Sequence, residues 1–185
     1  MLKELFAETR QMMDKTVEAI RHELAAIRTG RANLGILEHI RIPYYGSEVP
    51  VHQVATLSVA DATLITIKPF EKPLLQEIER AILKSDLGLT PMNDGTLIRL
   101  PIPPLTEERR KLLAKKVHEI REEGKLSLRN IRHSAREEAE LYESEKQITE
   151  DDLERAYQEI QKLTDHHSEE IDKISAVKEK EILGH

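Results

Sequence analysis

The sequence lacks cysteine and tryptophan, and it has only two phenylalanines and four tyrosines among its 185 residues. The absence of cysteine excludes disulfide bonds, cysteine-ligated zinc and thiol catalysis. With so few aromatic residues, the core must be mainly aliphatic. Charged residues make up 34% of the chain, and such a composition favours long helices that pack along narrow seams of Leu, Ile and Ala.

Long apolar runs and catalytic motifs are also missing. No stretch approaches the roughly 20 apolar residues of a membrane span, and the first residues, MLKELFAETRQ, lack the apolar core of a signal peptide. We therefore expect a soluble, cytoplasmic protein that has no membrane partner. There is no Gly-rich phosphate loop, nucleophile motif or HExxH pattern. We expect neither enzymatic activity nor a cofactor.

A metal site is not expected either. The adjacent residues His166 and His167 are accompanied by Asp165 and Glu170. Because neighbouring side chains on a straight helix point about 100° apart, the two His cannot both face one metal ion.

Positive charge is concentrated in one segment. Residues 109 to 136 hold ten Lys and Arg against three Glu, a balance of 10 − 3 = +7, whereas the whole chain has a formal net charge of −6. On a helix, seven side chains of this segment fall within an arc of about 100°. We call them the basic stripe: Lys111, Lys115, His118, Lys125, Arg129, Arg132 and Arg136.

The basic stripe has two interpretations. The apolar residues of the segment lie about 120° away from it, so one face of the helix can be buried while the other meets a partner. The first interpretation is a solvated helix face, and the second is a site for a polyanion such as nucleic acid. A merely soluble helix face usually interleaves both signs of charge at a spacing of four residues. We expect acidic residues, which are abundant elsewhere in the chain, to be missing from this stripe, and this favours the nucleic-acid interpretation.

Apolar periodicity predicts three long helices. The first covers residues 2 to 28, where a seam recurs with spacings of 4, 3, 4 and 3: Met13, Val17, Ile20, Leu24 and Ile27. The second begins at Thr106, whose hydroxyl can cap a helix, and runs to about Ser144. The third begins at Thr149, with Asp152 three residues later as a capping partner, and continues to the end of the chain.

Residues 31 to 105 differ in character. They contain all eight prolines of the chain and several β-branched clusters, together with a short helical pattern from Pro73 to Lys84. This composition predicts a small α/β module inserted between the first and second helices. Within it, Asn93-Asp94-Gly95 is a turn signal. The predicted domains are therefore residues 1–30 with 106–185, and residues 31–105.

Two short chain crossings connect these domains and have the character of a hinge. The predicted hinge residues are Gly30, Arg31, Pro103, Pro104 and Leu105. Elsewhere, Gly124 lies inside the second helix, where it costs about 1 kcal/mol relative to Ala. We interpret Gly124 first as a point of close helix packing, with a functional bend as the alternative.

Four separated motifs, in order along the chain, resemble the ribosome recycling factor family. They are IRTGRAN (27–33), PMNDGTLIRLPIPPLTEERRKLL (91–113), LRNIR (128–132) and KEKEIL (178–183). Any one of these motifs is weakly specific, but their joint occurrence over essentially the whole chain is highly specific. The resemblance implies an α+β, L-shaped protein in which a long three-helix bundle carries an inserted small β/α/β domain.

The resemblance also implies a non-catalytic function. Members of the family bind the intersubunit space of the ribosome after termination and, with elongation factor G and GTP, promote separation of the subunits. The family's helical domain contacts large-subunit rRNA. Carried over by motif, the contacts are Arg132 and Arg129 of LRNIR, Arg110 and Arg109 of EERR, and Arg28 and Arg31 of RTGRA. The basic stripe adds Lys125 and Arg136, and we expect a monomer because the three helical seams can satisfy one another.

One position departs from the family pattern. Many members continue LRNIR with a further Arg, whereas this chain has His133 followed by Ser134. We expect the phosphate contact there to be weaker, or to be supplied by Arg136 one turn later. Two alternatives stay open: Arg109 and Arg110 could pair with neighbouring Glu, and the whole rod could be an adaptor that binds an acidic protein helix.

Overall fold

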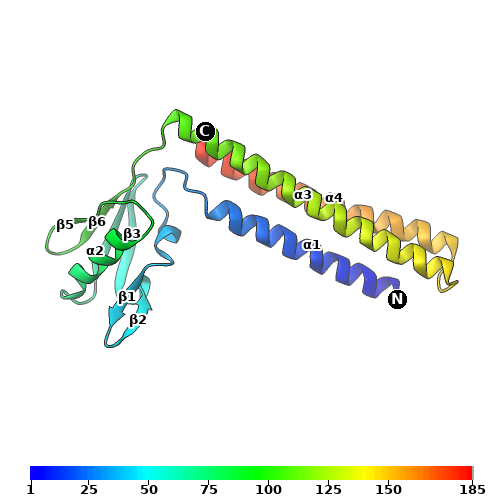
Figure 1. Ribbon diagram of the computed structural model, residues 1–185, viewed down its shortest axis with the longest axis horizontal. Coiled ribbons are helices and arrows are strands. Elements are labelled where there is room, and N and C mark those ends of the chain that lie inside the picture. The colour runs from blue at the N-terminus through cyan, green and yellow to red at the C-terminus, as the bar shows by residue number, and fades with distance from the viewer. Residues whose placement is uncertain (185) are drawn as a thin grey trace. The chain divides into compact units, whose positions relative to one another are not determined.

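The computed structural model describes residues 1–184 and divides the chain into two compact units (Figure 1). Unit 1 consists of Met1–Ile27 and Glu107–His185, and unit 2 consists of Arg28–Thr106. The structure confirms the predicted fold class of a three-helix bundle with an inserted β/α/β unit. Across residues 1–184, no helix combines the length and the apolar character that a membrane crossing needs.

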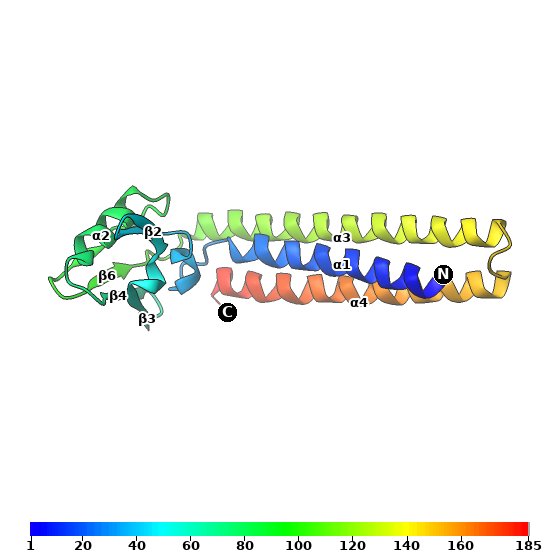
Figure 2. The same cartoon turned by 90° about the horizontal axis from the view of Figure 1, so that it is seen from below.

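Unit 1 is built from three helices that lie side by side (Figure 2): α1 (Leu2–Ala25), α3 (Glu107–Ser144) and α4 (Glu150–Leu183). Each helix packs against both others, so the edge between α3 and α4 lies opposite α1. The seam is aliphatic, and Met13, Leu128, Ile160 and Ile171 are fully buried in it. With 38 residues, α3 is about 57 Å long at 1.5 Å per residue.

The start of α4 matches the capping prediction. The Thr149 hydroxyl accepts a hydrogen bond from the Asp152 amide, and the Asp152 carboxylate accepts one from the Thr149 amide, each at 3.0 Å. This reciprocal pair satisfies backbone donors that the first helical turn leaves open. The first helix is shorter than predicted: α1 ends at Ala25, whereas the prediction extended it to residue 28.

Unit 2 contains a four-stranded antiparallel sheet, a separate hairpin and one α-helix. The sheet has the order β3-β4-β6-β5, and the hairpin pairs β1 with β2. The elements are η1 (Leu34–Leu37), β1 (Arg41–Tyr44), β2 (Ser47–Pro50), η2 (Val51–Gln53), β3 (Ala55–Asp61), β4 (Leu64–Pro69), α2 (Leu74–Lys84), β5 (Met92–Asn93) and β6 (Ile98–Pro101).

The core of unit 2 follows the period of two expected for strands. Ile65 and Ile67 of β4 and Ile98 and Leu100 of β6 are fully buried, and they pack in one cluster with residues of α2. The turn before β6 forms as predicted. The Asp94 carboxylate accepts hydrogen bonds from two backbone amides, each at 2.9 Å, and Gly95 has a φ of +90°.

Candidate nucleic-acid interface

The basic stripe lies on α3, along the edge that faces α4. The segment from Lys111 to Arg136 contains 26 residues and covers about 37 Å of helix. Four members of the stripe are exposed and three are half-buried. The exposed members are Lys111, Lys115, His118 and Arg129; the half-buried members are Lys125, Arg132 and Arg136.

Two cations on this edge are paired with a carboxylate from α4. Arg121 Nε and Lys125 Nζ both donate to Asp172 Oδ1, at 2.8 and 2.7 Å. Partial burial alone would raise the pKa of Asp172, but the hydrogen bonds from Lys125 and Arg121 outweigh it and hold the pKa below its ordinary value. Asp172 therefore partly neutralises Lys125, and Arg121 is a further cation of this edge that the stripe did not include.

Farther along α3, three arginines have no carboxylate partner within the described residues. Arg132 Nη1 donates to the amide oxygen of Gln161 at 3.4 Å, and the guanidinium carbon of Arg136 lies 4.2 Å from the centre of the Tyr157 ring. Arg129 is exposed and forms no hydrogen bond or ion pair within residues 1–184. Because the two α4 partners are uncharged, these three arginines keep their full positive charge. We call Arg129, Arg132 and Arg136 the arginine cluster.

The absence of acidic residues from the stripe needs a correction. Glu122 is exposed and follows His118 by four residues, so it lies on the same edge of α3. His133, at the position that departs from the family pattern, has its Nε2 3.1 Å from Glu137 Oε1. Lys111 also has a carboxylate partner, since its Nζ lies 3.8 Å from Glu107 Oε1. Carboxylates thus occur along this edge, but within the described residues none of them forms an ion pair with the arginine cluster.

The remaining predicted rRNA contacts lie near the ends of the two units. Arg109 and Arg110 are in the first turn of α3, where Arg109 is exposed and Arg110 is half-buried. The Nε of Arg110 is buried without a hydrogen-bond partner, and Arg110 forms no ion pair within residues 1–184. A neighbouring Glu therefore does not hold Arg110. Arg28 and Arg31 are exposed residues of unit 2.

The predicted hinge residues meet inside unit 2. Gly30 has a φ of +75°, in the left-handed region that favours glycine. A Cβ atom at Gly30 would lie 3.0 Å from Leu105 Cγ and 3.1 Å from the Leu105 amide nitrogen. The two chain crossings are thus in contact at this point, and Pro103 and Pro104 directly precede it.

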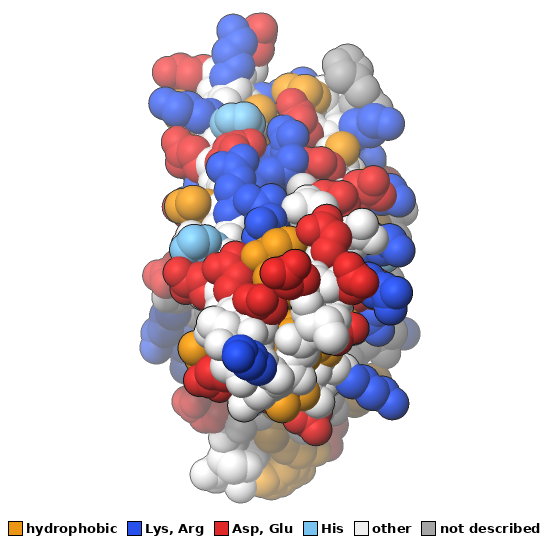
Figure 3. Space-filling view, turned by 90° about the vertical axis from the view of Figure 1, so that its right-hand side faces the viewer, with side chains coloured by type: hydrophobic (Ala, Val, Ile, Leu, Met, Phe, Trp, Pro, Cys, Tyr) orange, Lys and Arg blue, Asp and Glu red, His pale blue; other side chains and the backbone are white. Residues whose placement is uncertain are grey.

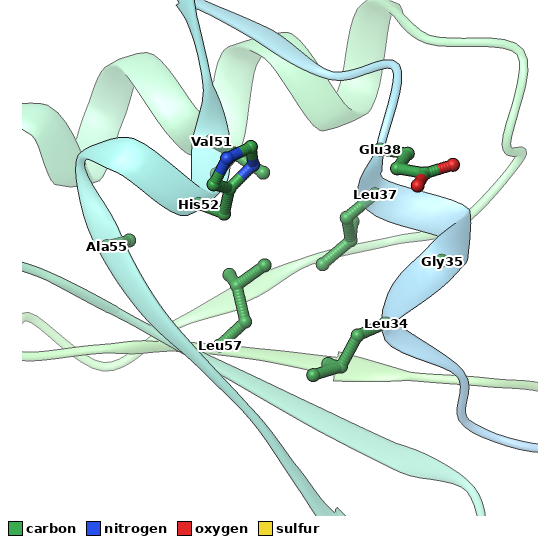
Figure 4. Close-up of a pocket in the computed structure, with 8 residues that line it drawn as sticks. All are labelled: Leu34, Gly35, Leu37, Glu38, Val51, His52, Ala55 and Leu57. Atoms are coloured by element: carbon green, nitrogen blue, oxygen red, sulfur yellow. The ribbon is translucent and has the colours of Figure 1, made fainter.

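Unit 2 also contains an apolar pocket of about 410 Å³ between η1 and β3 (Figure 4). The side chains of Leu34, Leu37 and Leu57 line it, and Glu38 and His52 lie at its rim. No hydrogen bond or ion pair joins Glu38 and His52, both of which are described residues. The pocket therefore does not contain the paired acid and base of a catalytic site.

The α3–α4 connection forms an acidic end of unit 1. Residues 137 to 155 hold nine Asp and Glu against two Lys and Arg, and Figure 3 looks onto this end, where acidic side chains gather. Glu138 accepts the Tyr142 hydroxyl at 2.6 Å, and this hydrogen bond is the main reason that the pKa of Tyr142 rises to about 12. Such an end repels phosphates and is therefore unsuited to nucleic-acid binding.

The adjacent histidines have different environments. His166 is exposed and lies 2.9 Å from Glu170. His167 is buried, with Nδ1 2.6 Å from the Leu163 carbonyl oxygen and Nε2 2.7 Å from Asp14 Oδ1. Both ring nitrogens of His167 thus have protein partners, and the residue connects α4 to α1.

Comparisons with known proteins agree with this architecture. The family model described as ribosome recycling factor matches residues 20–183. A ribosome-recycling factor from Geobacillus thermodenitrificans is 49% identical over 183 residues, which cover 99% of each chain. One from Thioalkalivibrio sulfidiphilus is 48% identical over 176 residues, 95% of each chain.

Two solved structures are similar over the whole length. A solution structure of the ribosome recycling factor has 40% identity and a TM-score of 0.80, covering 100% of this chain and 98% of its own. A structure of the Thermus thermophilus recycling factor with Escherichia coli elongation factor G, both bound to the E. coli post-termination complex, has 44% identity and a TM-score of 0.68, with complete coverage of both chains. These relatives place the chain among the factors of protein biosynthesis. It belongs to the ribosome recycling factor family.

Proposed function

We propose that this protein recycles ribosomes after translation termination. In this proposal it binds the intersubunit space and, together with elongation factor G and GTP, promotes separation of the two subunits. Family membership supports the proposal, as does the similarity to a recycling factor that is bound, with elongation factor G, to a post-termination complex. The GTPase supplies the chemistry, and this chain supplies the binding surface.

The arginine cluster is the observation that carries the proposal. Arg129, Arg132 and Arg136 keep their charge because their partners within the described residues are uncharged or absent. An arginine with a free planar fork of donors suits phosphate recognition. We propose that the cluster contacts large-subunit rRNA, with Arg109, Arg110, Arg28 and Arg31 as further contacts and with Lys125 as a weaker one, since Asp172 already pairs with it.

Co-sedimentation with isolated large ribosomal subunits at low and moderate salt tests this interface. Each phosphate contact contributes roughly 0.7 to 0.9 to the slope of log K against log salt concentration. We expect Arg132→Ala to weaken binding and to reduce that slope by about this amount. The matched control is Arg10→Ala, which removes the same charge from an exposed position on α1, on the opposite side of unit 1.

The outcomes of this experiment separate the alternatives. Equal effects of the two substitutions would show that only the net charge matters and would move the interface away from the α3–α4 edge. An absence of salt-sensitive binding by the unmodified protein would contradict rRNA recognition and favour the protein adaptor.

Asp172→Asn provides a second test with the opposite sign. The substitution removes the carboxylate that now pairs with Arg121 and Lys125, so it adds one net positive charge to this edge. We expect tighter binding to large subunits at low salt and a steeper dependence on salt. Unchanged or weaker binding by a folded variant would place these two cations outside the interface.

We also propose that the two units move about the hinge at Gly30, Arg31, Pro103, Pro104 and Leu105. The left-handed Gly30 and the consecutive prolines support this proposal. Because the chain has no cysteine, spin labels can be attached to two introduced cysteines, at Lys84 of unit 2 and Glu119 of unit 1. A broad distance distribution is expected, and a single narrow one would contradict the hinge.

A further inference from the structure

Tyr157 of α4 contacts the arginine cluster in a way that the sequence motifs do not indicate. The guanidinium carbon of Arg136 lies 4.2 Å from the centre of the Tyr157 ring, well inside the range of a cation–π contact. At its other end, the Tyr157 hydroxyl donates to Glu140 Oε1 at 2.7 Å. The half-buried ring is therefore held in place while its face supports Arg136.

The same hydroxyl also affects where the negative charge lies. Glu140 follows Arg136 by four residues, the spacing at which a carboxylate and a guanidinium usually pair on a helix. No ion pair between them within 4.0 Å occurs in this structure, where both residues are described. The Glu140 carboxylate instead accepts from Tyr157, so Arg136 is left beside an aromatic face instead of a carboxylate.

Arg136 and Tyr157 differ from the ion-paired cations Arg121 and Lys125 on the same edge of α3. Asp172 pairs with Arg121 and Lys125 through its charge, and it competes there with any phosphate. Tyr157 orients Arg136 without neutralising it, since an aromatic ring carries no net charge. An oriented and uncompensated guanidinium is the form that binds a phosphate with the least loss of side-chain freedom.

We propose that Tyr157 is a positioning residue of the rRNA interface, which holds Arg136 ready for a backbone phosphate and keeps Glu140 away from it. This inference rests on the proposed function. In this proposal Arg136 supplies the phosphate contact that the family pattern places at position 133. The ring of His133 itself lies beside Glu137. The interface then includes a side chain of α4 in addition to those of α3.

The size of the effect follows from side-chain ordering. Immobilising one long side chain on binding reduces affinity by roughly 2- to 12-fold, and preordering recovers this factor. Tyr157→Leu removes the aromatic face and the hydroxyl, and it should weaken binding to large subunits within that range. It also frees the Glu140 carboxylate to pair with Arg136, so the slope of the salt dependence should fall, by no more than the roughly 0.7 to 0.9 of one lost phosphate contact.

The experiment is a double-mutant cycle on binding of the full chain to isolated large subunits, measured at several salt concentrations. The variants are Tyr157→Leu, Tyr157→Phe, Arg136→Ala and the combination of Tyr157→Leu with Arg136→Ala. We expect Arg136→Ala to weaken binding and to lower the slope by roughly 0.7 to 0.9. Tyr157→Leu should then have no further effect in the Arg136→Ala background, and Tyr157→Phe, which keeps the ring, should lose less affinity than Tyr157→Leu.

Equal losses from Tyr157→Leu with and without Arg136 would overturn the inference, because they would show a general effect on the bundle. A lack of effect of Arg136→Ala would overturn it as well. Neither result affects the proposed function, which Arg132→Ala tests separately. Circular dichroism at each step verifies that the variants are folded.

Discussion

Replacement of Gly124 by Ala tests how tightly the three helices pack. Gly124 lies in the middle of α3 and is buried. A Cβ atom there would lie 2.8 Å from Ile20 Cγ1, 2.9 Å from Ile20 Cδ1 and 3.1 Å from Ile171 Cδ1. Ile20 is 5% exposed and Ile171 is fully buried, so any shift of either side chain must be accommodated inside the bundle core. This geometry supports the close-packing interpretation of the glycine.

Two opposing terms determine the free energy change of Gly124→Ala. Alanine is favoured over glycine inside a helix by about 1 kcal/mol. Against this, an ordinary van der Waals contact begins at 3.4 Å, so Ile20 Cγ1 must move by 3.4 − 2.8 = 0.6 Å. Overpacking of this kind costs about 1–3 kcal/mol. With a middle value of about 2 kcal/mol for the cost, the variant should be less stable by about 1 kcal/mol, or about 4 °C in Tm.

Urea unfolding followed by circular dichroism at 222 nm measures this change. The control is a double-mutant cycle with Ile20→Ala, which removes the atoms nearest to the new Cβ. In that background the close approach to Ile171 Cδ1 at 3.1 Å remains. Gly124→Ala should therefore stabilise by up to about 1 kcal/mol, and the coupling should approach about 2 kcal/mol. An increase in stability from Gly124→Ala alone would refute the packing argument.

Three further predictions concern single side chains. Ser175→Ala should stabilise the protein by about 0.5–1 kcal/mol in urea unfolding, because the buried Ser175 hydroxyl has no partner within residues 1–184. Asp14→Ala should cost about 1–3 kcal/mol by leaving the buried His167 Nε2 unpaired, and Asp14→Asn, whose amide oxygen can accept, should cost less in the same assay. Backbone hydrogen bonds lower the pKa of Asp94 from 3.8 to about 2, so its stabilising contribution should be complete above pH 3.8 and lost towards pH 2. An NMR titration of its carboxyl carbon should show only a partial rise of the pKa in Arg99→Ala, since the hydrogen bond from Arg99 contributes less than the backbone amides.

The long helices were predictable because their signals are local. The 4, 3, 4, 3 seam of α1 and the capping pair of Thr149 and Asp152 each need fewer than 30 neighbouring residues to be recognised. The end of α1 was less predictable. Apolar spacing continues to Ile27, but the helix stops at Ala25, and no capping residue in the sequence marks that end.

The sheet of unit 2 shows the opposite case. Strand-like segments were recognisable, but the order β3-β4-β6-β5 was not. The pairing of β4 with β6 joins segments on either side of α2, and no local pattern specifies which distant strand becomes a neighbour. The same limit applies to Gly30, whose contact with Leu105 connects the two ends of the inserted segment.

For the candidate interface, helical spacing placed the cations correctly on one edge of α3, but it could not tell which of them are neutralised. That depends on the register of α4 against α3, which puts Asp172 opposite Arg121, 51 residues away in the chain, and Gln161 opposite Arg132, 29 residues away. The local charge balance of +7 therefore overstates the positive charge near Lys125, which Asp172 partly neutralises. Near Arg132 the partner on α4 is the uncharged Gln161, and the positive charge is not reduced. Because the Asp172 carboxylate and a phosphate would compete for the same donors, the partners on α4 determine which cations of the edge are available to the rRNA that we propose as its ligand. They favour the cations of the arginine cluster over Arg121 and Lys125.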